Sequence, residues 1–228
     1  MEKYVTGLPK TILSYFLEDP DIQTESDRPA PQPRASPTPA PRESPWSRLA
    51  TDETEDPREP PVRQVAMIFC DGACFNNGRR GARAGFGVSV IREGAEVVAV
   101  SEPLRAEEPQ TNQRAELRGL AVALQHATAL AGAGVTTIRI YTDSEYAINC
   151  LTKWIPGWRR SGWRRATGEP VLHRDILEPL HDAWSGLRGV AFLEHVAAHT
   201  GRGDVLSRGN ERADTLARAS LARTGGLF

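Results

Sequence analysis

Apolar and polar positions follow two different periods after Arg63, and each period predicts a type of secondary structure. An apolar run at residues 64–70 and an alternating segment at 83–92 predict two strands. Gly94 marks a turn into a third strand at 95–101. Apolar runs at 137–142 and 190–196 predict a fourth strand and a fifth.

Helical spacing begins after Thr111, a favoured cap residue, because Leu117, Leu120, Ala121 and Leu124 share one helical face. Further helices are expected at residues 145–151, 173–187 and 210–222. Hairpin-like strands followed by strand–helix–strand crossovers predict an α/β fold. We therefore expect a five-stranded mixed sheet with helices on both faces.

The first quarter of the chain has a different composition. Twelve of the 17 prolines lie before residue 63, in a stretch that is also rich in Ser, Thr, Asp and Glu. Such a segment buries too little apolar surface to offset its ordering entropy, so residues 1–62 are predicted to be a disordered tail. A short apolar patch at 11–17 is either a helix turn or a motif that docks on a protein partner. The folded domain is expected at 63–224, followed by a short tail at 225–228.

Composition excludes several classes of protein. The chain has 228 residues, 39% of them apolar, which suffices for a core, and no apolar run is long enough to span a bilayer. The N-terminus lacks a secretory pattern, and its early acidic residues argue against a mitochondrial presequence. Three cysteines make no disulfide framework. We expect a monomer without membrane association, nuclear or cytoplasmic, with reduced thiols.

Charge is unevenly divided along the chain. Residues 1–62 hold 7 Lys and Arg against 12 Asp and Glu, a net charge of −5. The remaining residues hold 21 against 17, a net charge of +4. The predicted domain is mildly basic, which favours local patches that bind phosphates.

Four acidic residues stand at structural junctions. Asp71 and Asp143 follow predicted strands, Glu116 lies in the first turns of the helix after Thr111, and Asp214 lies in the last helix. Carboxylates are costly to bury without partners, and their oxygens are the ligands that Mg²⁺ prefers. If the fold gathers the four, they form a two-metal site. The alternative is four unrelated acids: a strand-end turn, a solvated helical Glu, a helix cap and a surface Asp.

Five segments around these acids occur in a recognisable order. They read DGACFNNG at 71–78, TNQRAE at 111–116, YTDS at 141–144, WIPGWRRSGW at 154–163, and NERAD at 210–214 after His199. In residues and order the chain resembles the ribonuclease H type 1 family, from about residue 63 to about residue 223. No segment matches the N-terminal hybrid-binding module that many such relatives carry.

The resemblance implies a ribonuclease H-like fold and an activity. Members cut the RNA strand of RNA–DNA hybrids and leave 5′-phosphate and 3′-hydroxyl ends, using two Mg²⁺ ions that Mn²⁺ can replace. By resemblance, Asp71, Glu116, Asp143 and Asp214 would be catalytic and bind the metals. His199 would assist in proton transfer or product release.

The resemblance also implies substrate contacts. Asn77, Asn112 and Gln113 would contact RNA 2′-hydroxyls, although Asn and Gln are also common turn and cap residues. The Trp- and Arg-rich stretch 154–165 would grip the DNA strand by charge and stacking, with Trp154 read as a packing residue. The expected DNA-strand and phosphate contacts are Thr111, Trp158, Arg159, Arg160, Trp163, Arg164, Arg165 and His173.

The chain departs from the family pattern in three places. Pro109 and His173 stand where relatives carry Arg and Asn, which alters the expected phosphate pocket. Residues 200–209 form a loop about five residues longer than in those relatives, which leaves the reach of His199 open.

Two rival functions are weighed against cleavage of hybrids. A catalytically silent hybrid-binding module would have lost one or more of the acids. An integrase- or exonuclease-like metal nuclease of the same fold would lack both the Trp/Arg segment and the Thr-Asn-Gln block. All these features are present here.

Overall fold

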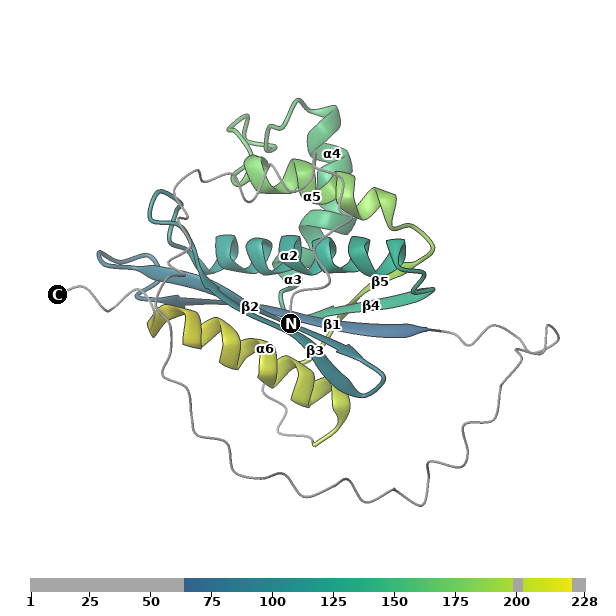
Figure 1. The fold of residues 1–228 in the computed structure, drawn as a ribbon. Coiled ribbons are helices and arrows are strands. Elements are labelled where there is room, and N and C mark those ends of the chain that lie inside the picture. Colours follow the sequence, from purple (N-terminus) through teal and green to yellow (C-terminus); the bar gives the residue numbers. More distant parts are fainter. Residues whose placement is uncertain (1–63, 199–202, 223–228) are drawn as a thin grey trace, which may run out of the picture. The chain divides into compact units, whose positions relative to one another are not determined.

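Three antiparallel strands open the part of the chain that the computed structural model describes, residues 64–198 and 203–222 (Figure 1). The predicted tails and His199 lie outside these residues. The described residues belong to one compact unit. Among their helices, none combines the length and apolar character needed to cross a membrane.

The sheet has five strands in the order β3-β2-β1-β4-β5. β1 (Val65–Phe75), β2 (Arg83–Arg92) and β3 (Ala95–Pro103) pair antiparallel, as a hairpin-connected series does. β4 (Thr137–Thr142) pairs parallel with β1, and β5 (Ala191–His195) pairs parallel with β4. This arrangement confirms the predicted five-stranded mixed sheet.

Helices cover both faces of the sheet (Figure 1). α2 and α5 lie on one face and α6 lies on the other. A run of helical segments, including one of π type, continues from residue 145 to residue 160, well beyond the helix predicted at 145–151. The helices are α2 (Asn112–Gly132), α3 (Glu145–Asn149), η1 (Cys150–Trp154), α4 (Ile155–Arg160), α5 (Arg174–Gly186) and α6 (Val205–Ala222).

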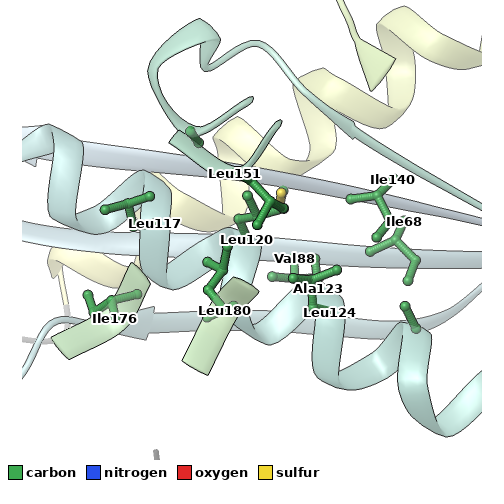
Figure 2. Packing of buried hydrophobic residues seen from close by; sticks show 14 of the residues in the cluster. Ile68, Val88, Leu117, Leu120, Ala123, Leu124, Ile140, Leu151, Ile176 and Leu180 are labelled. Atoms are coloured by element: carbon green, nitrogen blue, oxygen red, sulfur yellow. The ribbon is translucent and has the colours of Figure 1, made fainter. Parts of the chain in front are cut away.

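Alternating side chains of β1 divide the core into two layers. Ile68 and Cys70 belong to the larger apolar cluster, which includes residues of α2 and α5 (Figure 2). Phe69 points to the other face, where its ring stacks on Tyr141 at 5.0 Å between centroids and packs with Ala213 of α6. The period-two pattern of β1 therefore holds a helix on each face.

β1 and α6 differ from their predicted limits by five residues at one end. β1 continues five residues past Cys70, because its pairing with β2 runs on to Phe75 opposite Arg83. Asp71 thus lies inside a strand and not at its end. α6 starts at Val205, after Asp204, whose Oδ1 accepts a hydrogen bond from Ser207 N at 2.9 Å. Residues 205–209 of the expected loop are therefore helical.

Candidate active site

The two central strands separate where the acidic residues begin. β1 and β4 pair up to Phe69 opposite Tyr141 and no further. Asp71 stays in β1, opposite Gly87 of β2, whereas Asp143 follows the last residue of β4. The two carboxylates therefore stand close together just beyond the end of the parallel pairing, with Asp143 at the end of its strand as the sequence predicted.

Glu116 joins them from α2 because the helix lies against β1 at a glycine. A Cβ atom at Gly72 would stand only 2.4 Å from the backbone nitrogen of Glu116, so no larger residue fits. Asp71, Glu116 and Asp143 each offer a carboxylate oxygen, and these oxygens lie within 4.8 Å of one another. This spacing suits ligands of one divalent cation or of a close pair.

Two of the three carboxylates are buried, so water does little to screen their charge, and Asp143 is partly exposed. Asp71 is 7% exposed and Glu116 is 8% exposed. Burial, and next the charge of Asp143, raise the pKa of Asp71 from 3.8 to about 7. Burial, then Asp71 and Asp143, raise the pKa of Glu116 well above its usual value. A cation would remove this repulsion.

Glu116 also holds a polar atom that the described residues leave unsatisfied. Its Oε1 accepts a hydrogen bond from Asn112 Nδ2 at 3.2 Å. Its Oε2 is buried, and no described residue bonds to it. An orphaned carboxylate oxygen facing two further carboxylates fits an oxygen-binding divalent metal.

Asp214 lies near this group but is not a member of it. Its charge raises the pKa of Asp71, which shows that the two are close. Its Oδ1, however, accepts a hydrogen bond from Arg218 Nε at 2.8 Å. The fold brings three of the four predicted acids within ligand distance and leaves the fourth beside them, paired with an arginine.

Asn210 belongs to the site, although sequence reasoning did not single it out. It is 1% exposed, and its Nδ2 donates to Asp143 Oδ2 at 3.1 Å. Its Oδ1 is buried and lacks a partner among the described residues. The available signal was spacing, since Asn210 precedes Asp214 by four residues and so shares its face of α6.

The predicted RNA contacts connect to the carboxylates. Asn77 Oδ1, in the turn after β1, accepts a hydrogen bond from Asn112 N at 3.2 Å. The Asn112 side chain in turn bonds to Glu116. Gln113, next along α2, is exposed. Polar groups therefore run from the β1–β2 turn into the acidic site.

One tryptophan of the predicted DNA-binding segment, Trp163, is buried, contrary to the expectation that it contacts DNA. Trp163 is only 6% exposed and lies in the apolar core, with the Arg174 guanidinium 5.3 Å from its ring centre. Its ring is therefore not available to stack on a nucleic acid. Trp154, expected to pack, is 40% exposed. Its ring centre stands 5.7 Å from that of Trp158, which is partly buried.

The four arginines of this segment are all exposed, and three have partners. Arg159 pairs with Asp182 at 3.6 Å, Arg164 donates to the carbonyl of Gly168 at 2.8 Å, and Arg165 pairs with Glu169. Arg160 forms no ion pair with any described residue. Of the four arginines, Arg160 is therefore the one best able to pair with a phosphate.

The two predicted phosphate contacts lie at helix beginnings. Thr111 caps α2, and its Oγ1 accepts a hydrogen bond from Arg114 N at 3.3 Å. His173 precedes α5 with φ +60°. Burial, and next the charge of Arg114, lower the pKa of His173.

Comparison with known proteins agrees with this geometry. The family model described as RNase H matches residues 63–222. Ribonuclease H1 of Rattus norvegicus is 34% identical over 163 residues, 72% of this chain and 52% of that protein. Ribonuclease H of Cyanothece sp. is 36% identical over 160 residues, 70% of this chain and 90% of that protein. The chain spans about half the length of the rat relative.

Solved structures show the same fold. The solution structure of the PFV RNase H domain superposes with a TM-score of 0.57 at 19% identity, covering 71% of this chain and 97% of that one. A foamy viral protease-reverse transcriptase in complex with RNA/DNA hybrid gives a TM-score of 0.59 at 20% identity, covering 96% of this chain and 27% of that one. With the match over residues 63–222, these findings establish that the chain belongs to the ribonuclease H family.

Proposed function

We propose that this protein hydrolyses the RNA strand of RNA–DNA hybrids with two Mg²⁺ ions, leaving 5′-phosphate and 3′-hydroxyl ends. The observation that carries the proposal is the group of three carboxylates within 4.8 Å, two of them buried, in a chain of the ribonuclease H family. Its substrate follows from the relatives that bear the ribonuclease H name.

The metal ligands would be Asp71, Glu116 and Asp143, with Asp214 completing the set. Divalent ions at such a site supply a nucleophile at neutral pH and offset the charge that develops on the phosphate. Asp71, whose pKa is raised by burial and by the charges of both Asp143 and Asp214, would be one of the ligands. Asn210 holds one oxygen of Asp143, which leaves the other free to turn toward a metal. Mn²⁺ would also suit these oxygen ligands.

Recognition of RNA would come from the polar groups beside the acids. A 2′-hydroxyl both donates and accepts hydrogen bonds, and only the RNA strand has one. The Asn112 amide is held against Glu116, so a ribose that it contacts would lie next to the reacting phosphate. Asn77, which accepts from the Asn112 backbone, and the exposed Gln113 would extend the contact along the strand.

The DNA strand would lie on the segment that follows α3. Trp158 and the more exposed Trp154 offer aromatic faces, and exposed arginines surround them. Stacking and charge together suit a strand that must be held without reading its sequence.

A cleavage assay on four substrates tests the proposal. RNA–DNA, RNA–RNA, DNA–DNA and single-stranded RNA are incubated with Mg²⁺ and, separately, with a chelator. We expect cleavage of the hybrid alone, in Mg²⁺ alone, with products that a polymerase extends without phosphatase treatment. An Asp71→Asn protein purified in parallel controls for contaminating nucleases. Equal cleavage of DNA–DNA, or none of the hybrid in Mg²⁺ or Mn²⁺, would contradict the proposal.

A further inference from the structure

Arg114 is a buried cation outside the acidic site. It lies in the first turn of α2, two residues before Glu116, and is 6% exposed. Burying a guanidinium is costly unless it is paired and hydrogen-bonded. The partners of Arg114 therefore identify the segments that it connects.

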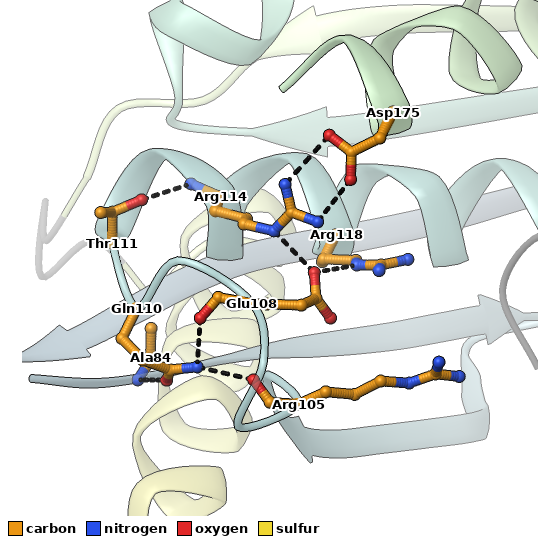
Figure 3. A network of polar contacts seen from close by, with 8 residues as sticks. All are labelled: Ala84, Arg105, Glu108, Gln110, Thr111, Arg114, Arg118 and Asp175. Carbon is orange, nitrogen blue, oxygen red and sulfur yellow. Dashed lines mark hydrogen bonds and ion pairs between the residues drawn. The ribbon is translucent and has the colours of Figure 1, made fainter. Parts of the chain in front are cut away.

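Asp175, in the first turn of α5, is the partner on one side (Figure 3). Arg114 Nη1 donates to Asp175 Oδ1 at 3.1 Å and Nη2 donates to Oδ2 at 2.5 Å. Two parallel hydrogen bonds fix the relative orientation of the two groups, which a single contact would not do. The beginning of α2 is thereby tied to the beginning of α5.

Glu108, in the connection between β3 and α2, is the partner on the other side. Its Oε2 accepts from Arg114 Nε at 2.6 Å and from Arg118 Nε at 2.9 Å. Gln110 fastens this connection to the sheet, because its Oε1 accepts from Ala84 N at 2.8 Å (Figure 3). Arg114 thus joins a segment anchored on β2 to α2 and to α5.

Apolar packing also brings α2 and α5 together, but it fixes their relative rotation less well than their separation. Leu117 and Leu120 of α2 and Ile176 and Leu180 of α5 lie in one core cluster (Figure 2). Apolar contact is not directional, so it sets how near the helices lie better than how they are rotated. The two parallel hydrogen bonds between Arg114 and Asp175, here called the fork, are directional and fix the relative rotation of the two helices.

The residues beside this fork are those to which substrate contacts are assigned. Thr111, Asn112 and Gln113 precede Arg114 on α2, and His173 precedes Asp175 at the beginning of α5. The Trp/Arg segment leads into α5 along the chain. Asn112 and Gln113 are predicted RNA contacts, whereas Thr111 and His173 are predicted phosphate contacts of the DNA strand. The separation of the two helix beginnings therefore sets how the contacts to the two strands lie relative to each other.

We propose that Arg114 is a positioning residue: through its fork with Asp175 it sets the spacing between the RNA-facing beginning of α2 and the DNA-facing segment before α5. It thereby selects a duplex of the width of an RNA–DNA hybrid. This inference rests on the proposed function. A buried ion pair is weak evidence for stability, and fixing register is its better-supported use.

Two variants test the inference. Arg114→Lys keeps the charge and loses the fork. Asp175→Asn removes the charge of a side chain that is 59% exposed, so it should fold even if the first variant does not. For both we expect KM for the hybrid to rise about tenfold with kcat changed less than about threefold, because the carboxylates keep their places. On an Asp71→Asn background, the preference for binding the hybrid over RNA–RNA should fall.

Arg212→Lys is the matched control. Arg212 of α6 also makes a fork, with Glu96 of β3 at 2.9 and 3.0 Å, on the other face of the sheet. Because the Arg212 side chain is 44% exposed, this variant should alter thermal unfolding less than Arg114→Lys, and it should leave KM unchanged. A rise in KM for this control equal to that of Asp175→Asn would overturn the inference.

A double-mutant cycle separates positioning from general loosening. If the fork places the DNA-facing segment, Asp175→Asn should raise KM less when Arg160 is already Ala. The Arg160 contact that the fork would have placed is then already missing. Strictly additive effects would overturn the inference, as would unchanged KM in both single variants. Failure of the proposed function would show earlier, as an unmodified protein that does not cleave the hybrid.

Discussion

At the scale of single residues, Asp71 is a buried carboxylate under electrostatic repulsion from its neighbours. Burial, and next the negative charges of Asp143 and Asp214, raise its pKa to about 7. A carboxylate kept in such a place without a cation opposes folding, so its presence is explained by what it binds.

Asp71→Asn should therefore abolish cleavage and spare substrate binding. The amide keeps the shape of the carboxyl and cannot supply the charge, so we expect a loss of roughly a hundredfold or more in kcat. Hybrid binding by the variant should stay close to that of the unmodified protein. Glu194→Gln, which removes a half-exposed carboxylate on β5 that pairs with Arg139, is the matched control and should cleave normally. Cleavage by Asp71→Asn within a few-fold of normal would remove Asp71 from the site.

Asn210 makes a second, finer prediction. Because its amide orients Asp143, Asn210→Ala should lower activity about 10- to 100-fold, the usual effect of losing a partner of a metal ligand. The loss should be partly recovered at higher Mg²⁺, because the ligand itself remains. Titration of the cleavage rate with Mg²⁺ measures this shift, with Glu211→Gln, the exposed neighbour, as control. Lower activity with an unchanged Mg²⁺ midpoint would point to misfolding instead.

At the scale of elements, the segment from α3 to α5 is where charge should act on binding. Arg160 has no ion pair with a described residue, whereas Arg165 is paired with Glu169. Arg160→Ala should therefore weaken hybrid binding and reduce the salt slope by about one, because one phosphate contact fewer releases counterions. Arg165→Ala should do less. Binding isotherms across a salt series, taken on an Asp71→Asn background, measure both. If the salt slope is the same for the Asp71→Asn protein and for both arginine variants, these arginines are solvated and do not contact phosphates.

Two tryptophans of this segment differ in burial: Trp163, expected to contact DNA, is buried in the core, whereas Trp154 is 40% exposed and packs against Tyr146 and Trp158. Trp163→Ala should destabilise the fold by about 3–5 kcal/mol, since it empties a core position. Trp154→Ala, at a position 40% exposed, should leave stability within about 1 kcal/mol and weaken hybrid binding. Denaturant unfolding and binding, measured on both variants, separate the two roles. Loss of binding without loss of stability in Trp163→Ala would return that residue to the substrate surface.

Many of the helices and strands could be predicted from the sequence. The features that could not be predicted depend on contacts between segments distant in sequence. The strands at 83–92 and 137–142 were predicted with correct limits, and the helix after Thr111 with its correct beginning, because period and capping are local. The end of β1 was missed because it depends on the length of β2, which continues to pair beyond Asp71. The burial of Trp163 was likewise missed, since several tryptophans in one segment look equivalent until tertiary packing distinguishes them. The acids were found from their neighbours, whereas Asn210 needed the approach of α6 to Asp143.

At the scale of the whole molecule, the acidic site should make stability depend on pH and on metal. Asp71 has a pKa of 3.8 ordinarily and of about 7 in the folded protein. Between these values the folded state holds a proton that the unfolded state has released, so its contribution to stability falls as pH rises from about 4 to about 7. Glu116, with its raised pKa, acts in the same direction.

Mg²⁺ should reverse this loss, because it binds the ionised carboxylates of the folded state. We expect the increase in Tm on adding Mg²⁺ to be larger at pH 8 than at pH 5, and small at both in Asp71→Asn. Thermal unfolding in chelator and in Mg²⁺ at the two pH values measures it. The same increase at both pH values in the unmodified protein would contradict the predicted coupling.

The close approach of helices to the sheet has a consequence for how a mutational library of this protein would read. Added Cβ atoms would meet Glu116 N at 2.4 Å from Gly72, Ala213 O at 2.3 Å from Gly87, and the Phe69 ring at 2.3 Å from Gly209. A growth or cleavage selection would therefore score these three positions as intolerant as the acids, although hydrogen is their whole side chain. Only a second screen, for soluble protein that still retains hybrid, would divide the two groups. The acids would pass that screen, and the glycines, whose substitution lifts a helix from the sheet, would fail it.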